Sequence, residues 1–300
     1  MTTARLLFTL VLVAALFLTA CGDNRPTSTT VDPIASAAAS AAVDDVAAAV
    51  VAAKRVRIGV KADTPPFGSK AGATYLGFDI DIAQAVAKQL ETILKVPGLE
   101  VEFVTVTSRD RDDKLLAGEI DMVVASMTIT RFRDREQHLD FTIPYFQDGQ
   151  SLLVTKESPI ATYLDLAGRP VGFVRGSTSG YYLAQVAPDC KATKYEDFSA
   201  LFAALDAGEI EAATSDQLIL MGRLRAAKNP DAYRIAGERF TTEPYGIAVR
   251  ENQSAWRDAL NEAIQQLWEN GRWAIIADTW FGPTSTYPTT LGFAITPYPK

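Results

Sequence analysis

Residues 115–126 read LLAGEIDMVVAS, and residues 205–216 read LDAGEIEAATSD. The two stretches align without a gap, and a Gly-Glu-Ile triplet coincides. Each has the pattern of a helix end, a glycine corner and a short apolar strand. Further strand patterns at 56–60, 101–106 and 170–174 alternate with helical ones. We therefore predict an α/β fold with largely parallel strand pairing.

The last residue of each stretch is polar and stands where its strand ends, so that Ser126 aligns with Asp216. Open α/β sheets place ligand-binding groups at the carboxyl ends of their strands. Two lobes that face each other would thus present Ser126 from one side and Asp216 from the other. The alternative is that such helix–strand corners are common and that the match arose by chance.

A cluster of hydrogen-bond donors follows the first of these strands. Residues 125–133 read ASMTITRFR, in which Ser126 and Thr128 precede Arg133. Two hydroxyls and a guanidinium fork at a strand end make a good receptor for a small carboxylate. The alternative is a polar strand end followed by an arginine-rich turn in water.

The composition limits the classes of function. The chain has 300 residues, 48% of them apolar, which is enough for a substantial core. Its net charge of −7 argues against a nucleic-acid partner. The one histidine, His138, lies in a polar turn, and the sequence has no metal-ligand cluster, nucleophile motif or Gly-rich phosphate loop. We therefore expect no metal, no cofactor and no enzymatic activity.

The N-terminus has the pattern of a secreted lipoprotein. An apolar run at 6–18 follows a basic residue, and Leu-Thr-Ala-Cys at 18–21 closes that run. This resembles a bacterial lipobox, which implies a signal peptide at 1–20 and a lipid on Cys21 that anchors the protein to the extracytoplasmic face of the membrane. The alternative is an ordinary signal peptide, or an anchor, with an incidental cysteine. Residues 21–53 are rich in Ala and Ser, and we expect a low-complexity tether there. Its Ala-rich part can form a helix from about residue 43 onward, because aspartates at 44 and 45 stand near its start.

Nine short motifs follow one another along the rest of the chain. They are PPF at 65–67, GFDIDI at 77–82, GEID at 118–121, SMTIT at 126–130 with Arg133, DFTIPY at 140–145, DLAG at 165–168, GST at 176–178, EPYGIAV at 243–249 and GRW at 271–273. With these motifs, residues 56–282 resemble the bacterial extracellular solute-binding proteins of family 3, the amino-acid-binding proteins of ABC importers. The lipobox and the tether add a likeness to glutamate- and glutamine-type binding lipoproteins of actinobacteria.

The resemblance implies an α/β fold of the two-lobed periplasmic-binding-protein type II, with a double-strand hinge. Lobe 1 is expected to comprise residues 54–147 and 243–300, and lobe 2 residues 148–242. The chain would cross between the lobes near 145–152 and again near 242–249.

The resemblance also implies how a free amino acid is held. Arg133 would clamp the α-carboxylate, with Ser126 and Thr128 as further donors. Thr178, at the start of a helix in lobe 2, would add donors where a helix N-terminus favours an anion. Asp216 would take the α-ammonium group.

Side-chain selectivity is expected from Lys61, Ser108 and Arg111. In relatives that resemble binders of basic amino acids, the position of Lys61 carries an acid, and the position of Arg111 is apolar or aromatic in binders of basic or amide ligands. Ser108 precedes Arg111 as in binders of glutamate and aspartate. We therefore expect an acidic ligand, with glutamine and asparagine as alternatives. The other interpretations are that Lys61 is a loop lysine in water and that Arg111 pairs with the aspartates around it.

Further residues are expected near the site. Arg175 follows its strand as Lys61 follows its own, and would be a third cation; the alternative is an arginine that faces solvent. Thr64 replaces a frequent aromatic platform of the family, which leaves Phe67, Phe78 or Tyr145 as candidate walls, with core packing as the alternative for the two phenylalanines.

The expected function is binding without chemistry. A monomeric protein would close its lobes around the amino acid, and an ABC-transporter permease would recognise the closed form. One alternative is a sensor that signals through another membrane receptor without transport. Another is an enzyme on the same fold, a dehydratase or a peptidoglycan-cleaving enzyme. For the tail at 284–300 we expect an extended segment that packs on a lobe.

Overall fold

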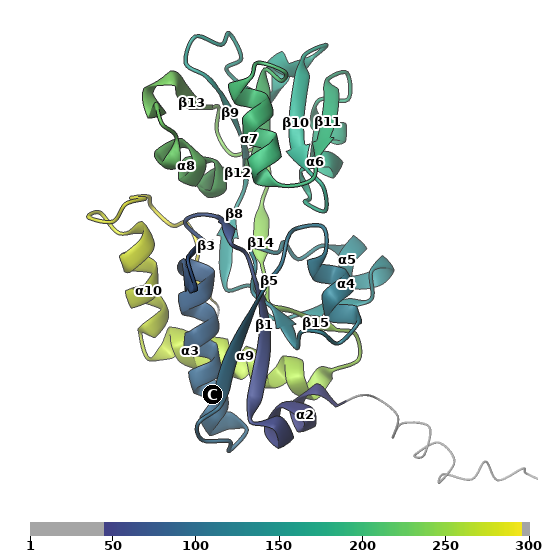
Figure 1. The fold of residues 1–300 in the computed structure, drawn as a ribbon, viewed down its shortest axis with the longest axis vertical. Coiled ribbons are helices and arrows are strands. Elements are labelled where there is room, and N and C mark those ends of the chain that lie inside the picture. Colours follow the sequence, from purple (N-terminus) through teal and green to yellow (C-terminus); the bar gives the residue numbers. More distant parts are fainter. Residues whose placement is uncertain (1–44, 296–300) are drawn as a thin grey trace, which may run out of the picture. The chain divides into compact units, whose positions relative to one another are not determined.

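Two five-stranded sheets form the centres of two lobes in the computed structural model, which describes residues 45–295 (Figure 1). The sheet of lobe 1 has the order β5 (Glu100–Thr105), β1 (Arg55–Val60), β6 (Met122–Val123), β15 (Ala248–Arg250), β7 (Leu139–Phe141). The sheet of lobe 2 has the order β11 (Lys191–Tyr195), β10 (Pro170–Val174), β12 (Ala212–Asp216), β9 (Gln150–Thr155), β13 (Tyr233–Ala236). The first three strands of each sheet are parallel, and antiparallel strands complete it.

The internal repeat is a repeat of structure. Gly59 of β1 pairs with Val123 of β6, and Gly172 of β10 pairs with Ala213 of β12, the residue that aligns with Val123. A Cβ atom on Gly59 would lie 2.6 Å from Cδ1 of Ile120, and one on Gly172 would lie 2.5 Å from Cδ1 of Ile210. Each glycine therefore makes room for the isoleucine of its Gly-Glu-Ile triplet.

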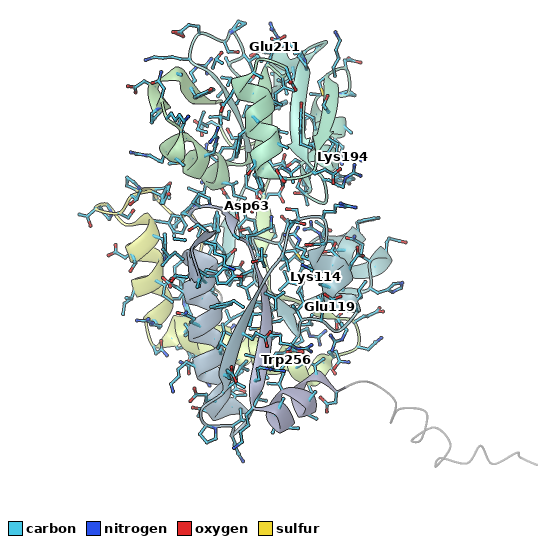
Figure 2. All side chains as sticks on the ribbon, in the orientation of Figure 1. Asp63, Lys114, Glu119, Lys194, Glu211 and Trp256 are labelled. Atoms are coloured by element: carbon cyan, nitrogen blue, oxygen red, sulfur yellow. The ribbon has the colours of Figure 1, made fainter. Side chains whose placement is uncertain are left out.

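Helices cover the sheets, and the periodicity of their apolar residues explains why. Lobe 1 carries α3 (Phe78–Ile93), α4 (Arg111–Leu116), α5 (Arg131–Glu136), α9 (Ser254–Glu269) and α10 (Arg272–Phe281); lobe 2 carries α6 (Ser179–Val186), α7 (Phe198–Asp206) and α8 (Gln217–Ala226). In α3 the apolar stripe of Ile82, Val86 and Leu90 is buried, as an amphipathic helix requires. Trp256 of α9, labelled in Figure 2, is buried and donates from Nε1 to the carbonyl oxygen of Asp121 at 3.1 Å.

The smaller elements are two short 3₁₀ helices and two small sheets. The 3₁₀ helices are η2 (Tyr163–Leu166) and η3 (Pro230–Ala232), and the small sheets are β2 (Asp63–Thr64) with β3 (Gly68–Ala71) and β4 (Thr74–Leu76), and β8 (Phe146–Asp148) with β14 (Glu243–Tyr245). β8 and β14 are antiparallel and run between the lobes (Figure 1). Both strands lie within the segments 145–152 and 242–249, where the chain was expected to cross between the lobes.

The last part of the expected tether packs on lobe 1. Residues 46–53 form the helix α2 (Val46–Ala53), which begins after Asp45 as N-cap. Val46 and Val50 are buried, and the amide of Val46 donates to Oε1 of Gln253 at 3.0 Å. Two apolar contacts one helical turn apart thus attach this segment to lobe 1. The expected signal peptide, Cys21 and the rest of the tether lie outside the described residues.

The C-terminal segment packs on lobe 1, as predicted for the tail. Residues 284–295 form no helix or strand. The ring centroid of Phe293 lies 5.8 Å from that of Trp273 and 6.4 Å from that of Phe146, and Ile295 is buried. Within residues 45–295, none of the helices has the length and apolar character needed to cross a membrane.

Candidate functional site

A cavity between the two lobes collects the polar residues of the strand ends. Its volume is about 20 Å³ for the centres of water-sized spheres, and about 320 Å³ when all space between atoms and open solvent are counted. All eight residues of the main sequence prediction line it: Lys61, Ser108, Arg111, Ser126, Thr128, Arg133, Thr178 and Asp216. The sequence prediction missed four lining residues: Ser177, Phe198, Ser215 and Ile219. Ser177 and Ser215 stand beside predicted positions, whereas Phe198 and Ile219 carry no polar signal.

The topology of the sheets explains this assembly. Lys61 follows β1 directly, and Ser126 lies just beyond the end of β6. Thr178 lies beyond β10, and Asp216 is the last residue of β12. These four strands are parallel within their sheets, so their carboxyl ends lie on one edge of each lobe, where open α/β sheets bind ligands.

Arg133 is buried in the cavity wall with its guanidinium fixed. The N-cap residue of α5, Thr130, accepts a hydrogen bond from the amide of Arg133 at 3.1 Å. Nη1 donates to the carbonyl of Thr128 at 2.6 Å, and Nη2 donates to the carbonyl of Gly176 in lobe 2 at 3.0 Å. Burial, and then the charge of Arg111, lower the pKa of Arg133 to about 10, so it is still cationic at neutral pH. These side-chain bonds use two of the five N–H donors of the fork.

Arg111 is a second buried guanidinium, only 2% exposed. Nη1 donates to the carbonyl of Ala125 at 2.8 Å and Nη2 to that of Gly176 at 3.4 Å. Its Nε has no hydrogen-bond partner within the described residues, but it forms an ion pair with Oδ1 of Asp112 at 3.7 Å. The alternative in which Arg111 pairs with an aspartate beside it is thus borne out for Asp112. Burial lowers the pKa of Arg111 from its ordinary value.

Lys61 is a third buried cation, only 3% exposed, so the alternative of a loop lysine in water is wrong. Its Nζ donates to Oγ of Ser108 at 2.6 Å and lies 5.3 Å from the ring centroid of Phe198 in lobe 2. Burial, and then the charge of Arg111, lower the pKa of Lys61 to about 8. An anion bound beside Lys61 would stabilise its charged form.

Asp216 is the buried carboxylate of the cavity. Its side chain accepts a hydrogen bond from the hydroxyl of Tyr245. Burial, and then the negative charges of Glu243 and Asp148, raise the pKa of Asp216 well above its usual range. A cation bound here would favour the ionised form.

Asp79 is a carboxylate whose role the sequence did not show. An aspartate at a helix start usually caps the helix, but the N-cap residue of α3 is Gly77. Instead Oδ2 of Asp79 accepts from the amide of Ser126 at 2.7 Å and from its hydroxyl at 2.9 Å, while Oδ1 accepts from the hydroxyl of Tyr145 at 2.9 Å. Burial raises the pKa of Asp79 to about 6.

Two hydroxyls that were expected to face a ligand donate to the protein instead. The hydroxyl of Ser126 donates to Asp79, and the φ of Ser126 is +46°, a conformation that this bond pair helps to hold. The hydroxyl of Thr178 donates to Oε2 of Glu243 at 3.0 Å. Each hydroxyl has one proton, so neither can also donate to a ligand carboxylate while these bonds persist.

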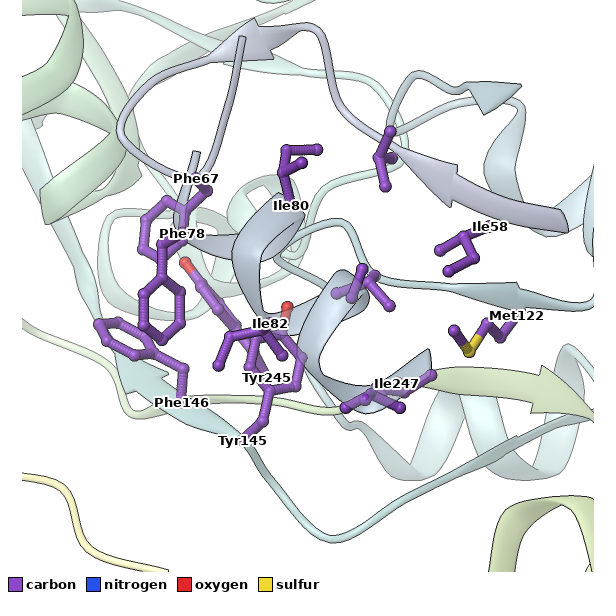
Figure 3. Close-up of a cluster of buried hydrophobic side chains, with 14 of the residues drawn as sticks. Ile58, Phe67, Phe78, Ile80, Ile82, Met122, Tyr145, Phe146, Tyr245 and Ile247 are labelled. Atoms are coloured by element: carbon purple, nitrogen blue, oxygen red, sulfur yellow. The ribbon is translucent and has the colours of Figure 1, made fainter. Parts of the chain in front are cut away.

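None of the further residues that were expected near the site lines the cavity. Arg175 forms an exposed ion pair, with Nη2 2.8 Å from Oε1 of Glu196. Phe78 and Tyr145 are buried in the aromatic cluster of lobe 1, with ring centroids 6.4 Å apart (Figure 3). His138 lies in solvent beside Glu251, and the described residues hold no cluster of three or more metal-ligand side chains.

The comparison with known sequences identifies the family. The sequence profile of the bacterial extracellular solute-binding proteins, family 3, matches residues 56–283. The chain belongs to this family. The fold of a family 3 protein, two α/β lobes of the periplasmic-binding-protein type II, is thus confirmed for this chain.

Individual family 3 relatives are named for several amino acids. The ABC transporter glutamine-binding protein GlnH of Bacillus subtilis is 39% identical over 75% of this chain and 81% of its own length. The glutamate-binding protein GluB of Corynebacterium efficiens is 30% identical over 86% of this chain and 84% of its own length. A solved structure of an ancestral arginine-binding protein bound to glutamine matches with a TM-score of 0.70 and 37% identity, over 76% of this chain and 98% of that one.

Proposed function

We propose that this family 3 protein binds a free amino acid between its lobes and delivers it to the permease of an ABC importer. One observation carries the proposal: Arg133 of lobe 1 and Asp216 of lobe 2 line the same buried cavity. A guanidinium fork and a carboxylate are the partners that an α-carboxylate and an α-ammonium group require. A zwitterion that reaches both residues bridges the lobes and favours the closed form.

We further propose that the ligand is acidic, glutamate or aspartate. Beyond the Arg133–Asp216 pair the cavity contains Lys61 and Arg111, both buried and both cationic. A side-chain carboxylate would meet two charge-assisted donors there, each stabilising the complex by about 1.5–3 kcal/mol. It would also relieve the repulsion between Lys61 and Arg111. A basic side chain would meet like charges instead.

Glutamine is the second candidate ligand. It is supported by the name of the relative from Bacillus subtilis and by the glutamine in the ancestral structure. An amide oxygen can accept from Lys61 or Arg111, but such a bond to a neutral acceptor is weaker than one to a carboxylate. The proposed order of affinity is therefore acidic amino acids first, amides second and basic amino acids last.

Titration calorimetry with glutamate, aspartate, glutamine, arginine and lysine tests this order. We expect glutamate or aspartate to bind about tenfold more tightly than glutamine, from the difference between charged and neutral hydrogen bonds. We expect arginine and lysine to bind at least about a hundredfold more weakly, because of like-charge repulsion. Preferred binding of lysine would contradict the selectivity assigned to Lys61.

Arg111→Leu tests the role of the second guanidinium. Removing this charge-assisted donor should weaken glutamate binding by about tenfold to a hundredfold, and glutamine binding by less. Arg175→Leu is the matched control, because Arg175 pairs with Glu196 on the surface and should leave both affinities unchanged. An equal loss for glutamate and glutamine in Arg111→Leu would mean that Arg111 supports the fold of the site without selecting the ligand.

The partners and the location are part of the proposal. We propose a monomer that is anchored through a lipid on Cys21 at the outer face of the membrane. Delivery to a permease is favoured over sensing because the Bacillus subtilis relative is named as part of an ABC transporter. Copurification of the permease with the ligand-bound protein would test this step. We propose no catalytic activity, since the relatives named above are binding proteins.

A further inference from the structure

Two tyrosines of the hinge region each donate a hydrogen bond to a buried carboxylate. These carboxylates lie near the carboxyl ends of the two aligned strands, β6 and β12. In lobe 2, the hydroxyl of Tyr245 donates directly to Asp216. In lobe 1, the hydroxyl of Tyr145 donates to Asp79, which in turn holds Ser126. The amide of Tyr145 donates to the carbonyl of Tyr245 at 2.8 Å, so the two tyrosines are themselves hydrogen-bonded neighbours. The residues at the two aligned positions, Ser126 and Asp216, are thus both linked by hydrogen bonds to this pair of tyrosines in the hinge.

Tyr245 packs against residues of lobe 1, although its hydroxyl donates to a carboxylate of lobe 2. It is fully buried, and its ring centroid lies 5.4 Å from that of Phe67 and 5.9 Å from that of Phe146 (Figure 3). Its backbone forms a β-bridge with Thr128, the residue that accepts from Arg133. The position of its hydroxyl is therefore set by the lobe that carries the carboxylate clamp.

We propose that Tyr245 is a positioning residue, which holds the Asp216 carboxylate in place for the ammonium group of the ligand and links that carboxylate to the crossover strand. This inference rests on the proposed function, in which Asp216 receives an ammonium group. Tyr245 does not line the cavity, so it acts through Asp216 and not by touching the ligand.

The charges around Asp216 show what the hydroxyl contributes. Glu243 of β14 and Asp148 of β8 repel its negative charge, and Arg133 of α5 attracts it. The cations Lys61 and Arg111 of lobe 1 also face it. Donation from Tyr245 stabilises the ionised carboxylate and so lowers its pKa, against burial and the two acids that raise it. Without the hydroxyl, the pKa of Asp216 would rise further.

Tyr245→Phe isolates this contribution, because it keeps the ring and removes one hydroxyl. The affinity of the best amino-acid ligand is measured for the variant and for the wild type by calorimetry from pH 6 to pH 9. An ammonium group needs the ionised Asp216, so the variant should lose about tenfold to a hundredfold at pH 6. The loss should shrink as the pH rises, because Asp216 is then ionised in both proteins. Lys61, whose pKa is about 8, and the ligand titrate in both proteins, so the ratio of the two affinities removes the part of their titration that the variant leaves unchanged.

Tyr233→Phe is the matched control. The hydroxyl of Tyr233 donates to Oδ1 of Asp206 at 2.7 Å, which is the same kind of bond on the surface of lobe 2. Its affinity ratio to the wild type should be about one at every pH. A loss in Tyr245→Phe that is the same at every pH, or no loss, would overturn the proposal. If the wild type binds none of the amino acids in the panel, the proposed function fails, and this inference fails with it.

Discussion

Arg133→Ala is expected to weaken the binding of every amino acid by roughly a thousandfold. The α-carboxylate is common to all of these ligands, and two charge-assisted hydrogen bonds to it contribute about 1.5–3 kcal/mol each. The side chain is 4% exposed, so water does not replace the lost donors easily. The variant also loses the bond from Nη2 to the carbonyl of Gly176, which joins the lobes.

The control for this variant lies two residues away. Arg131 begins the same helix, α5, but is exposed. Arg131→Ala should therefore keep the affinity of the wild type within about twofold, as surface charges contribute little. Calorimetry with the preferred amino acid and with glutamine measures both variants. If Arg133→Ala keeps the affinity of the wild type, Arg133 does not bind the α-carboxylate of the ligand.

Gly222→Ala is expected to prevent lobe closure without altering the cavity. Gly222 lies in α8 of lobe 2, and a Cβ atom there would lie 1.7 Å from the carbonyl oxygen of Pro65 in lobe 1. Backbone cannot give way at that distance, so the lobes would have to separate. We expect the affinity to fall by at least about a hundredfold, because the ligand then loses the contacts of one lobe.

A second measurement separates blocked closure from misfolding. Alanine is favoured over glycine inside a helix by about 1 kcal/mol, so the melting temperature without ligand should stay the same or rise. Small-angle X-ray scattering should show ligand-induced compaction in the wild type and none in Gly222→Ala. Arg225→Ala, an exposed position of the same helix, should behave as the wild type does. A lower melting temperature in Gly222→Ala would mean that the substitution damages lobe 2 instead.

The repeat and the strand patterns were sufficient to predict the architecture. Parallel strands with a helix between them put their carboxyl ends on one edge, so the alignment of Ser126 with Asp216 led to the cavity. Arg133 was found because a guanidinium follows a strand end, whereas Lys61 and Arg111 came from the resemblance to the family. Their burial could not be read from the sequence, since it depends on Phe198 and on the approach of lobe 2 to Lys61.

Physical causes also explain which contacts could not be predicted from the sequence. Asp79 looked like an N-cap because aspartate at a helix start usually caps it, but its contacts are with Ser126 and Tyr145, which are distant in sequence. Those bonds, and not local propensity, decide where the hydroxyl of Ser126 points. The packing of residues 46–53 on lobe 1 could not be predicted, because an Ala- and Val-rich stretch shows no partner of its own. Its partner is α9, two hundred residues away, through Gln253.

A crystal structure of the protein with bound L-glutamate tests the central claim most directly. We predict the α-carboxylate at the guanidinium of Arg133 and the ammonium group at Asp216, each within hydrogen-bond distance. We predict the side-chain carboxylate at Lys61 and Arg111. A glutamate bound in the reverse orientation, with its ammonium group away from Asp216, would contradict the claim that these two residues recognise the zwitterion across the lobes.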